Sequence, residues 1–277
     1  MNNIKISTFN VNSVKARLPN LLVWLKQSNP DVVLLQELKC VENDFPFEAI
    51  LDVGYNAVVL GQKTYNGVAI LSKYKIEDVI KSLPNFRGYG EEQARYIEAV
   101  ISLPSNSAMR VASIYVPNGG GEILPNQKLE ETEKFRYKLD FFDALHAHFK
   151  RLLTYDEIAV FGGDYNVALD DIDAYDAKNL HNTVCFHELE KQKFRKILGL
   201  GLVDSYRSFY PQNQAFTWWD YRGNSWKFNK GLRIDYLLLS PQAADRATAA
   251  LIEDNGVRDL EKASDHCPMS VRLGIGN

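Results

Sequence analysis

The sequence predicts an α/β fold: a four-layered α/β sandwich in which two packed, mixed β-sheets are flanked by helices. Two observations predict this class. Short apolar strand patterns recur through both halves of the 277-residue chain, and each half also contains amphipathic helix patterns. No linker rich in Gly, Ser or Pro and no internal repeat divides the chain, so we expect a single catalytic domain over residues 1–277.

The first half begins with a strand, because residues 4–9 alternate between apolar and polar side chains. A helix follows, in which four leucines share one face: Leu18, Leu21, Leu22 and Leu25. Residues 32–35 are all apolar, which is typical of a strand buried on both faces. Three more strands are predicted, and their short connections favour antiparallel pairing: residues 67–72, 96–103 and 110–116.

The second half begins with another amphipathic helix, whose apolar face is formed by Phe135, Leu139, Phe142, Leu145 and Phe149. We expect His146 and His148 of this helix to face solvent, since residues two apart do not share a helix face. A buried strand at 158–161 and a helix at 186–198 follow. The last part is rich in strands, predicted at residues 216–221, 233–240, 247–252 and 268–273.

Composition restricts the class of protein. The chain has 32 Lys and Arg against 35 Asp and Glu, a formal net charge of −3, which excludes a uniformly basic nucleic-acid-binding protein but allows a local basic face. The three cysteines form no CxxC pair, which argues against a disulfide framework or a cysteine zinc site. The N-terminus lacks a signal-peptide core, and no apolar run approaches the ~20 residues of a membrane helix. We therefore expect a cytoplasmic protein without a membrane partner.

Polar side chains lie at the ends and starts of the predicted strands. They are Asn10, Glu37, Asp164, Asn166, Asp235, Asp265 and His266. Because the end of one strand lies beside the start of its antiparallel neighbour, these positions can share one rim of the sandwich. Rims of rigid sheets commonly present catalytic residues.

Each of these residues also has an ordinary structural interpretation. Asp164 and Asn166 are typical of a turn after a strand, and a lone Glu37 is typical of a solvent-facing charge. The combination indicates more. Carboxylates and amides without cysteine suit Mg²⁺ or Mn²⁺, and a histidine beside carboxylates suits proton transfer or a hydrogen bond to phosphate. Together they favour metal-assisted phosphodiester hydrolysis.

Five motifs occur in a fixed order: residues 10–17 (Asn-Val-Asn-Ser-Val-Lys-Ala-Arg), 35–39 (Leu-Gln-Glu-Leu-Lys), 162–166 (Gly-Gly-Asp-Tyr-Asn), 232–236 (Leu-Arg-Ile-Asp-Tyr) and 264–268 (Ser-Asp-His-Cys-Pro). With them, the chain resembles the endonuclease/exonuclease/phosphatase superfamily from end to end. Residues 115–119 (Tyr-Val-Pro-Asn-Gly) and 217–222 (Thr-Trp-Trp-Asp-Tyr-Arg) narrow the resemblance to abasic-site endonucleases of the bacterial exonuclease III type.

The resemblance implies a metal site. Glu37 matches the principal Mg²⁺ ligand, with Asn10 and Asp265 nearby and Asn12 assisting. The family assigns the metal position in more than one way, so three further residues are candidate ligands: Asp164, Asn166 and His266. Some relatives have Asp where this chain has Asn12, so the site here has one formal charge fewer.

The resemblance also implies catalytic roles. Asp164 would activate the attacking water, and Asn166 would hold Asp164 and the scissile phosphate. His266 would donate to a phosphate oxygen, Asp235 would orient His266, and the phenol of Tyr115 would stabilise charge or protonate the leaving group. Both Asp164 and His266 remain candidates for the general base.

Substrate contacts follow from aromatic and basic residues. One of two adjacent tryptophans should fill the core, and the resemblance favours Trp218 as the wall of a pocket for a flipped, baseless nucleotide. Two acid-free segments predict a phosphate-binding track: Lys5, Lys15, Arg17 and Lys26, and then Arg222, Lys227, Lys230 and Arg233. Arg95, in the segment 91–95, matches a backbone contact in the family. Asn118 stands where exonuclease III has Gln, with the same donors and acceptor on a shorter side chain.

These observations predict a Mg²⁺-dependent DNA-repair nuclease, with Mn²⁺ able to substitute. It would cut duplex DNA 5′ of abasic sites, with 3′-to-5′ exonuclease and 3′-end-cleaning activity. It would act as a monomer in the cytoplasm, associated with the nucleoid during repair. Two alternatives are a phosphatase of phosphoinositide or sphingolipid head groups and a DNA-binding module without catalysis.

Overall fold

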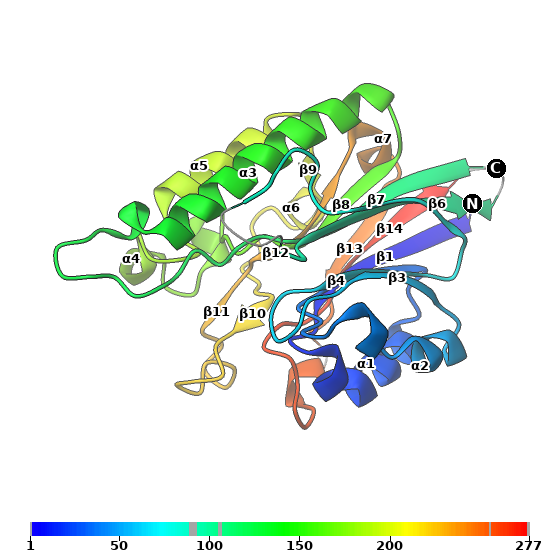
Figure 1. Ribbon diagram of the computed structural model, residues 1–277, viewed down its shortest axis with the longest axis horizontal. Helices are drawn as coiled ribbons and strands as arrows, with labels where there is room; N and C mark the ends of the chain where they lie inside the picture. Colours follow the sequence, from blue (N-terminus) through cyan, green and yellow to red (C-terminus); the bar gives the residue numbers. More distant parts are fainter. Residues whose placement is uncertain (1, 89–92, 105–106, 255, 276–277) are drawn as a thin grey trace.

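The computed structural model describes residues 2–88, 93–104, 107–254 and 256–275. Two six-stranded sheets pack face to face and helices cover both outer faces, as Figure 1 shows. Each sheet contains one parallel pair among antiparallel pairs, so both are mixed. The predicted four-layered α/β sandwich is confirmed.

The first sheet has the strand order β13-β14-β1-β2-β4-β3. In chain order its strands are β1 (Asn2–Asn10), β2 (Val32–Gln36), β3 (Asn56–Leu60), β4 (Val68–Ser72), β13 (Ala247–Ile252) and β14 (Met269–Ile275). Helices α1 (Val14–Ser28) and α2 (Phe47–Asp52) cover its outer face (Figure 1). Helix α1 joins the parallel strands β1 and β2, because parallel neighbours need a crossover connection of about a dozen residues or more.

The second sheet has the order β5-β6-β7-β8-β12-β9. Its strands are β5 (Ile76–Lys81), β6 (Tyr96–Leu103), β7 (Ser107–Tyr115), β8 (Ala159–Asp164), β9 (Val203–Asp204) and β12 (Asp235–Leu239). Helices α3 (Glu133–Leu152) and α5 (Glu188–Leu198) cover it (Figure 1). Three short helices, α4 (Ala177–Leu180), α6 (Ser205–Phe209) and α7 (Pro241–Ala244), and a small ribbon of β10 (Trp218–Trp219) and β11 (Gly231–Leu232) complete the fold.

The core forms three main layers of buried side chains. Between the sheets, Ile6 and Leu34 belong to the same apolar cluster as Val160 and Leu237 of the facing sheet. Under α1 a second cluster includes Trp24, and under α3 and α5 a third is rich in aromatic residues. Burial of this apolar surface, at roughly 25 cal/mol per Å², is the main stabilising contribution to such a sandwich.

The structure corrects several sequence-based expectations. Strands β3 and β5 were not predicted; β5 is an exposed edge strand whose register breaks between Glu77 and Ile80, so it lacks a clear alternating pattern. The strand predicted at 216–221 is reduced to the two residues of β10. The expectation that His148 faces solvent was wrong: His148 is buried, and its Nε2 lies 2.6 Å from Oε2 of Glu98 on the sheet beneath α3.

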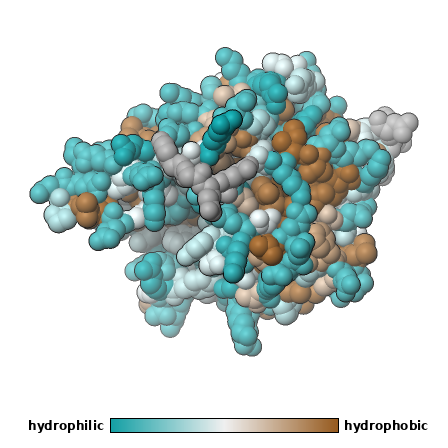
Figure 2. Space-filling model, viewed as in Figure 1, coloured by the Kyte–Doolittle hydropathy of each residue, from teal (hydrophilic) through white to brown (hydrophobic). Residues whose placement is uncertain are grey.

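None of the described helices is long and apolar enough to cross a membrane. Figure 2 shows a face that is mostly hydrophilic, with hydrophobic side chains gathered toward its right-hand part.

Candidate active site

The predicted rim residues meet where strand ends of the two sheets come together. Asn10 ends β1, Glu37 directly follows β2, Asp164 ends β8 and Asp235 begins β12. The antiparallel register places Asp235 directly opposite Asp164. Across the gap between the sheets, Nδ2 of Asn10 donates to Oδ2 of Asp164 over 3.0 Å. His266, which lies just before β14, joins the same cluster.

Glu37 is held as a carboxylate by its neighbours. Nδ2 of Asn10 donates to Oε1 over 2.9 Å, and Nζ of Lys39 lies 2.9 Å from Oε2. Burial raises the pKa of Glu37, but the Lys39 ammonium and the Asn10 hydrogen bond outweigh burial, so the pKa lies below its ordinary value. Glu37 therefore presents negative charge to the rim at neutral pH.

Asp164 is in the opposite condition. It is 1% exposed, and its Oδ1 accepts a hydrogen bond of 2.8 Å from the backbone N–H of Asn166. Its pKa is raised to about 8, because burial and the nearby carboxylates of Asp235 and Glu37 together outweigh the opposing charge of His266. A carboxyl group whose pKa lies near neutral pH is suited to accept and release a proton.

Gly163 allows Asp164 to be placed this way. A Cβ atom at Gly163 would lie 1.9 Å from the carbonyl oxygen of Ile114, so only glycine lets β8 approach β7 so closely. The strand then continues into the site with Asp164 as its last residue.

His266 is oriented by two carboxylates. Its Nδ1 lies 2.8 Å from Oδ2 of Asp235, and its Nε2 lies 3.7 Å from Oδ2 of Asp164. Burial lowers the pKa of His266, but the charges of Asp235 and Asp164 outweigh burial and raise the pKa to about 10. An imidazolium held between two carboxylates can donate a hydrogen bond to an anionic oxygen.

The same cluster has the donors that a divalent cation requires. One N or O atom each from Glu37, Asp164 and His266 lies within 4.8 Å of the others, and His266 could join the ligands only after losing its proton. Carboxylate oxygens without thiolate suit a hard cation such as Mg²⁺, which would also offset the crowding that raises the pKa of Asp164. When bound, such a cation would supply positive charge beside the phosphate oxygens of the substrate.

Asp265 lies beside this cluster but is already hydrogen-bonded. Its Oδ1 accepts from Nδ2 of Asn12 over 2.8 Å, and its Oδ2 accepts from Nε1 of Trp218 over 3.0 Å. Lys39 in turn donates to Oδ1 of Asn12. Asp265 and Asn12 therefore connect the Glu37 side of the rim to Trp218.

A buried lysine fixes the main chain at Asn118 and Asn166, whose side-chain amides are hydrogen-bonded to each other. Nδ2 of Asn118 donates to Oδ1 of Asn166 over 3.1 Å, and Nζ of Lys138 donates to both main-chain carbonyls, over 3.1 Å to Asn118 and 2.6 Å to Asn166. Lys138 is fully buried and also forms an ion pair with Glu190 of α5. Sequence reasoning missed Lys138; its position three residues after Phe135, on the apolar face of α3, was the available signal.

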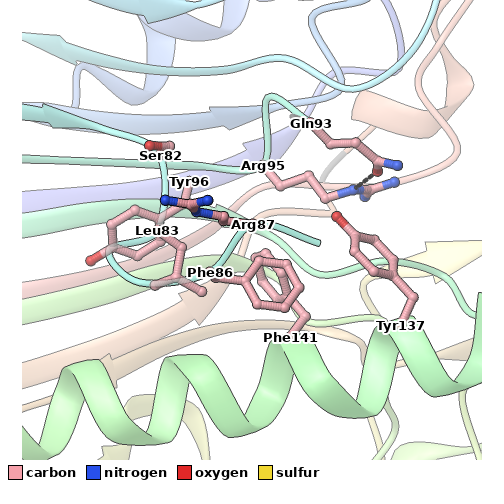
Figure 3. Close-up of a pocket in the computed structure, with 9 residues that line it drawn as sticks. All are labelled: Ser82, Leu83, Phe86, Arg87, Gln93, Arg95, Tyr96, Tyr137 and Phe141. Carbon is pink, nitrogen blue, oxygen red and sulfur yellow. Dashed lines mark hydrogen bonds between the residues drawn. The ribbon is translucent and has the colours of Figure 1, made fainter. Parts of the chain in front are cut away.

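Tyr115 ends β7 and faces the carboxylates. Burial and the charges of Glu37 and Asp164 raise its pKa well above the ordinary value, so the phenol keeps its proton at neutral pH. The Arg95 guanidinium lies over the Tyr115 ring, 4.7 Å from the centroid. Figure 3 shows Arg95 hydrogen-bonded to Gln93 with the phenol of Tyr137 close by; residues 91 and 92 of the segment 91–95 lie outside the described residues.

A pocket of about 430 Å³ adjoins these groups. Its polar side includes Glu37, Asp164 and His266, and its other walls come from Leu180, Val184, Cys185, Trp218, Leu232 and Ile234. Trp218 lines the pocket, whereas Trp219 is 2% exposed and belongs to the core between the sheets. Arg222 also lines the pocket and pairs with Asp220 over 2.8 Å.

The predicted basic track was wrong at two positions. Lys5 is buried and lies 2.8 Å from Glu253, and Arg233 is fully buried between Asp173 and Asp204, so neither can reach DNA. Lys230 is exposed but does not line the pocket. The sequence showed no acid near these cations because their partners lie far along the chain.

Comparison with known proteins identifies the family. Residues 7–266 match the endonuclease/exonuclease/phosphatase family. The chain belongs to this family.

Individual relatives cover almost the whole chain. Exodeoxyribonuclease III of Haemophilus influenzae is 30% identical over 96% of this chain and 98% of its own length. A 3′ phosphatase from Neisseria, bound to a product DNA hairpin, is 36% identical with a TM-score of 0.88, covering 98% of this chain and 100% of that one. An AP endonuclease from Archaeoglobus fulgidus is 34% identical with a TM-score of 0.87 and the same coverage.

Proposed function

We propose that this member of the family is a Mg²⁺-dependent DNA-repair nuclease that hydrolyses duplex DNA 5′ of abasic sites and also processes 3′ ends. The family and its relatives make the chain a metal-dependent phosphodiesterase that acts on DNA. The observation that carries the finer proposal is the cluster of Glu37, Asp164 and His266 at the mouth of a pocket walled by Trp218. The enzyme would act as a monomeric, single-domain protein over residues 1–277, in the cytoplasm.

In this proposal the buried polar groups divide the chemistry among themselves. Glu37 would hold the cation, with Asn10 and Asp265 as neighbouring candidate ligands. Asp164 takes the proton of the attacking water, and a bound cation would offset the carboxylate crowding that raises the pKa of Asp164 in the metal-free site. His266, oriented by Asp235, donates to a phosphate oxygen, and Asn166 fixes Asp164 through the backbone hydrogen bond. Tyr115 keeps its proton and can donate it toward the leaving oxygen.

The pocket supports selection of a nucleotide that lacks a base. Val184 and Leu232 give apolar surface to the pocket that Asp164 also lines, and Trp218 can stack on a sugar. An abasic nucleotide has little stacking to lose on leaving the duplex, so extruding it into this pocket is inexpensive compared with a normal nucleotide.

One gel assay tests the proposal. Purified protein is mixed with intact, nicked, 3′-phosphorylated and abasic duplexes, in Mg²⁺, in Mn²⁺ and in EDTA. We expect cleavage 5′ of the abasic site and release of 3′ phosphate with either metal, and neither reaction in EDTA. Glu37→Gln should raise the Mg²⁺ concentration required for half-maximal cleavage by about 10- to 100-fold.

The matched control is Glu48→Gln, which removes an exposed glutamate of α2 away from the rim and should leave the metal requirement unchanged. An abasic duplex that remains intact with Mg²⁺ while 3′ phosphate is released would restrict the activity to 3′ ends. Hydrolysis of phosphoinositide head groups with no DNA cleavage would refute the proposal.

A further inference from the structure

A second pocket, of about 390 Å³, lies beside the active site. It is formed where the start of α1 meets the segment between β13 and β14, and Figure 1 shows this segment next to α1. Nδ2 of Asn20 in α1 donates to the carbonyl oxygen of Glu261 over 3.0 Å, which joins the two elements. Its lining residues are Ala16, Arg17, Tyr221, Arg258, Leu260, Lys262 and Ala263.

Of the described residues that line this pocket, three are positively charged and none is a carboxylate. Among the described residues, no Asp or Glu forms an ion pair with Arg17, Arg258 or Lys262. Two cations of the predicted track are neutralised by comparison: Lys15 pairs with Asp44 over 2.9 Å, and Arg222 pairs with Asp220. The pocket therefore brings together three cations that form no ion pair with a described carboxylate.

Arg258 is a buried and rigidly held part of this pocket. It is 8% exposed, and its guanidinium donates to the main-chain carbonyls of Ser264 and Trp219 while its Nε has no hydrogen-bond partner among the described residues. A buried guanidinium without a counter-ion is destabilising unless an anion comes near it. The Nε of Arg17 is likewise buried without a partner.

Tyr221 connects the pocket to the active site. Its hydroxyl accepts from Nη2 of Arg17 over 3.1 Å and from Nδ2 of Asn12 over 3.3 Å, and it donates to the carbonyl oxygen of Ala263 over 2.8 Å. Asn12 also donates to Asp265. The Arg258 guanidinium lies over the Tyr221 ring, 5.4 Å from its centroid. The side chain of Tyr221 would thus separate an anion in the pocket from the rim residues.

We propose that this pocket is an anion site that binds a backbone phosphate of the DNA substrate, flanking the phosphate that is cut. The proposal rests on the proposed function and names a contact for it. Guanidinium groups bind phosphate oxygens through paired, charge-assisted hydrogen bonds, and a lysine at the pocket edge adds a point charge. The site would fix the position of the strand so that the scissile phosphate meets Asp164 and His266.

The test uses Arg17→Gln together with Lys262→Gln, and leaves Arg258 in place because it holds the main chain. Binding of abasic duplex is measured in EDTA from about 50 to 200 mM salt. We expect the double variant to bind about tenfold more weakly at low salt, with a slope of log K against log[salt] that is smaller by about one. In Mg²⁺, KM should rise about tenfold with kcat unchanged, since the residues of the chemical step are intact.

Two comparisons make the result specific. Lys150→Gln together with Lys196→Gln removes two exposed charges from α3 and α5 and should leave slope and KM as in the wild type. Lys262→Gln alone, at an exposed position, should show part of the effect even if the double variant folds poorly. A salt slope and KM equal to the wild type in both pocket variants would overturn the proposal.

The source of the phosphate is decided by a thermal unfolding series with inorganic phosphate. If phosphate stabilises the wild type but not the double variant, while the salt slope for DNA is unchanged, the pocket binds free phosphate and the DNA contact is wrong. If the wild type cleaves no DNA but the slopes differ as expected, the proposed function fails and the DNA-binding pocket stands.

Discussion

Two buried aspartates on either side of the loop after β8 differ in almost every electrostatic respect. Asp164 faces the carboxylates of Asp235 and Glu37 with one imidazole between them, and its pKa is raised to about 8. Asp173 is 0% exposed, accepts from Nε of Arg233 over 2.7 Å and pairs with Arg207. Burial raises the pKa of Asp173 too, but Arg233 and Arg207 outweigh burial and hold the pKa below its ordinary value.

The contrast shows that burial does not decide whether a carboxylate is structural or functional. The balance of neighbouring charge decides it. Around Asp173 the guanidinium groups match the carboxylates, so the cluster is complete in itself. Around Asp164 negative charge is in excess, and such a cluster favours an added cation or a proton.

The largest expected effect comes from changing the site with excess charge. Asp164→Asn should lower single-turnover cleavage of abasic duplex by about 10⁴-fold, because a neutral amide neither takes a proton nor offers charge to a cation. DNA affinity in EDTA should stay near the wild-type value. The free energy of unfolding in EDTA should be at least as large as that of the wild type, since the substitution removes carboxylate crowding.

The second effect tests the balanced cluster. Asp173→Asn should lower the free energy of unfolding by about 3–5 kcal/mol, because it leaves Arg233 buried with only Asp204 as a carboxylate partner. Urea denaturation measures this loss. The kcat of folded protein should change little. A stable Asp173→Asn variant beside an unstable Asp164→Asn variant would contradict the charge-balance interpretation.

How well the sequence predicts each cluster depends on how far apart its interacting residues lie along the chain. The rim could be predicted because Asn10, Glu37 and Asp164 each follow a recognisable buried strand, and strand ends meet by simple pairing rules. The Asp173 cluster could not, because its partners lie in other segments and Arg233 has the local sequence of a surface cation. A charge run in a sequence therefore says little about exposure.

The same limit applies to helices and pockets. Lys138 was not recognised because a lysine on an amphipathic helix usually lies in solvent, and only packing of α3 against α5 shows its partner Glu190. Likewise, no local sequence pattern marks Arg258 and Lys262. The pocket that they form with Arg17 exists only after α1 and the segment before β14 come together.

The smallest expected effect is a dependence on pH that has opposite sign in the two clusters. The folded-state pKa of Asp173 lies below its unfolded value, so its stabilising effect is present above about pH 4 and is lost as pH falls through the folded-state pKa. The deficit of Asp173→Asn relative to the wild type should therefore shrink in acid, by roughly 1 kcal/mol between about pH 5 and 3.

Asp164 should behave in the reverse way in EDTA. Its folded-state pKa of about 8 lies above the unfolded value, so the wild type is most stable below about pH 4 and loses this contribution as pH rises toward 8. The stability of Asp164→Asn relative to the wild type should accordingly increase with pH over that range. Denaturation curves of both variants at matched pH values measure the two trends. Parallel trends would mean that the neighbouring charges do not distinguish the clusters. Opposite trends would identify the Asp164 cluster as the one that requires a cation.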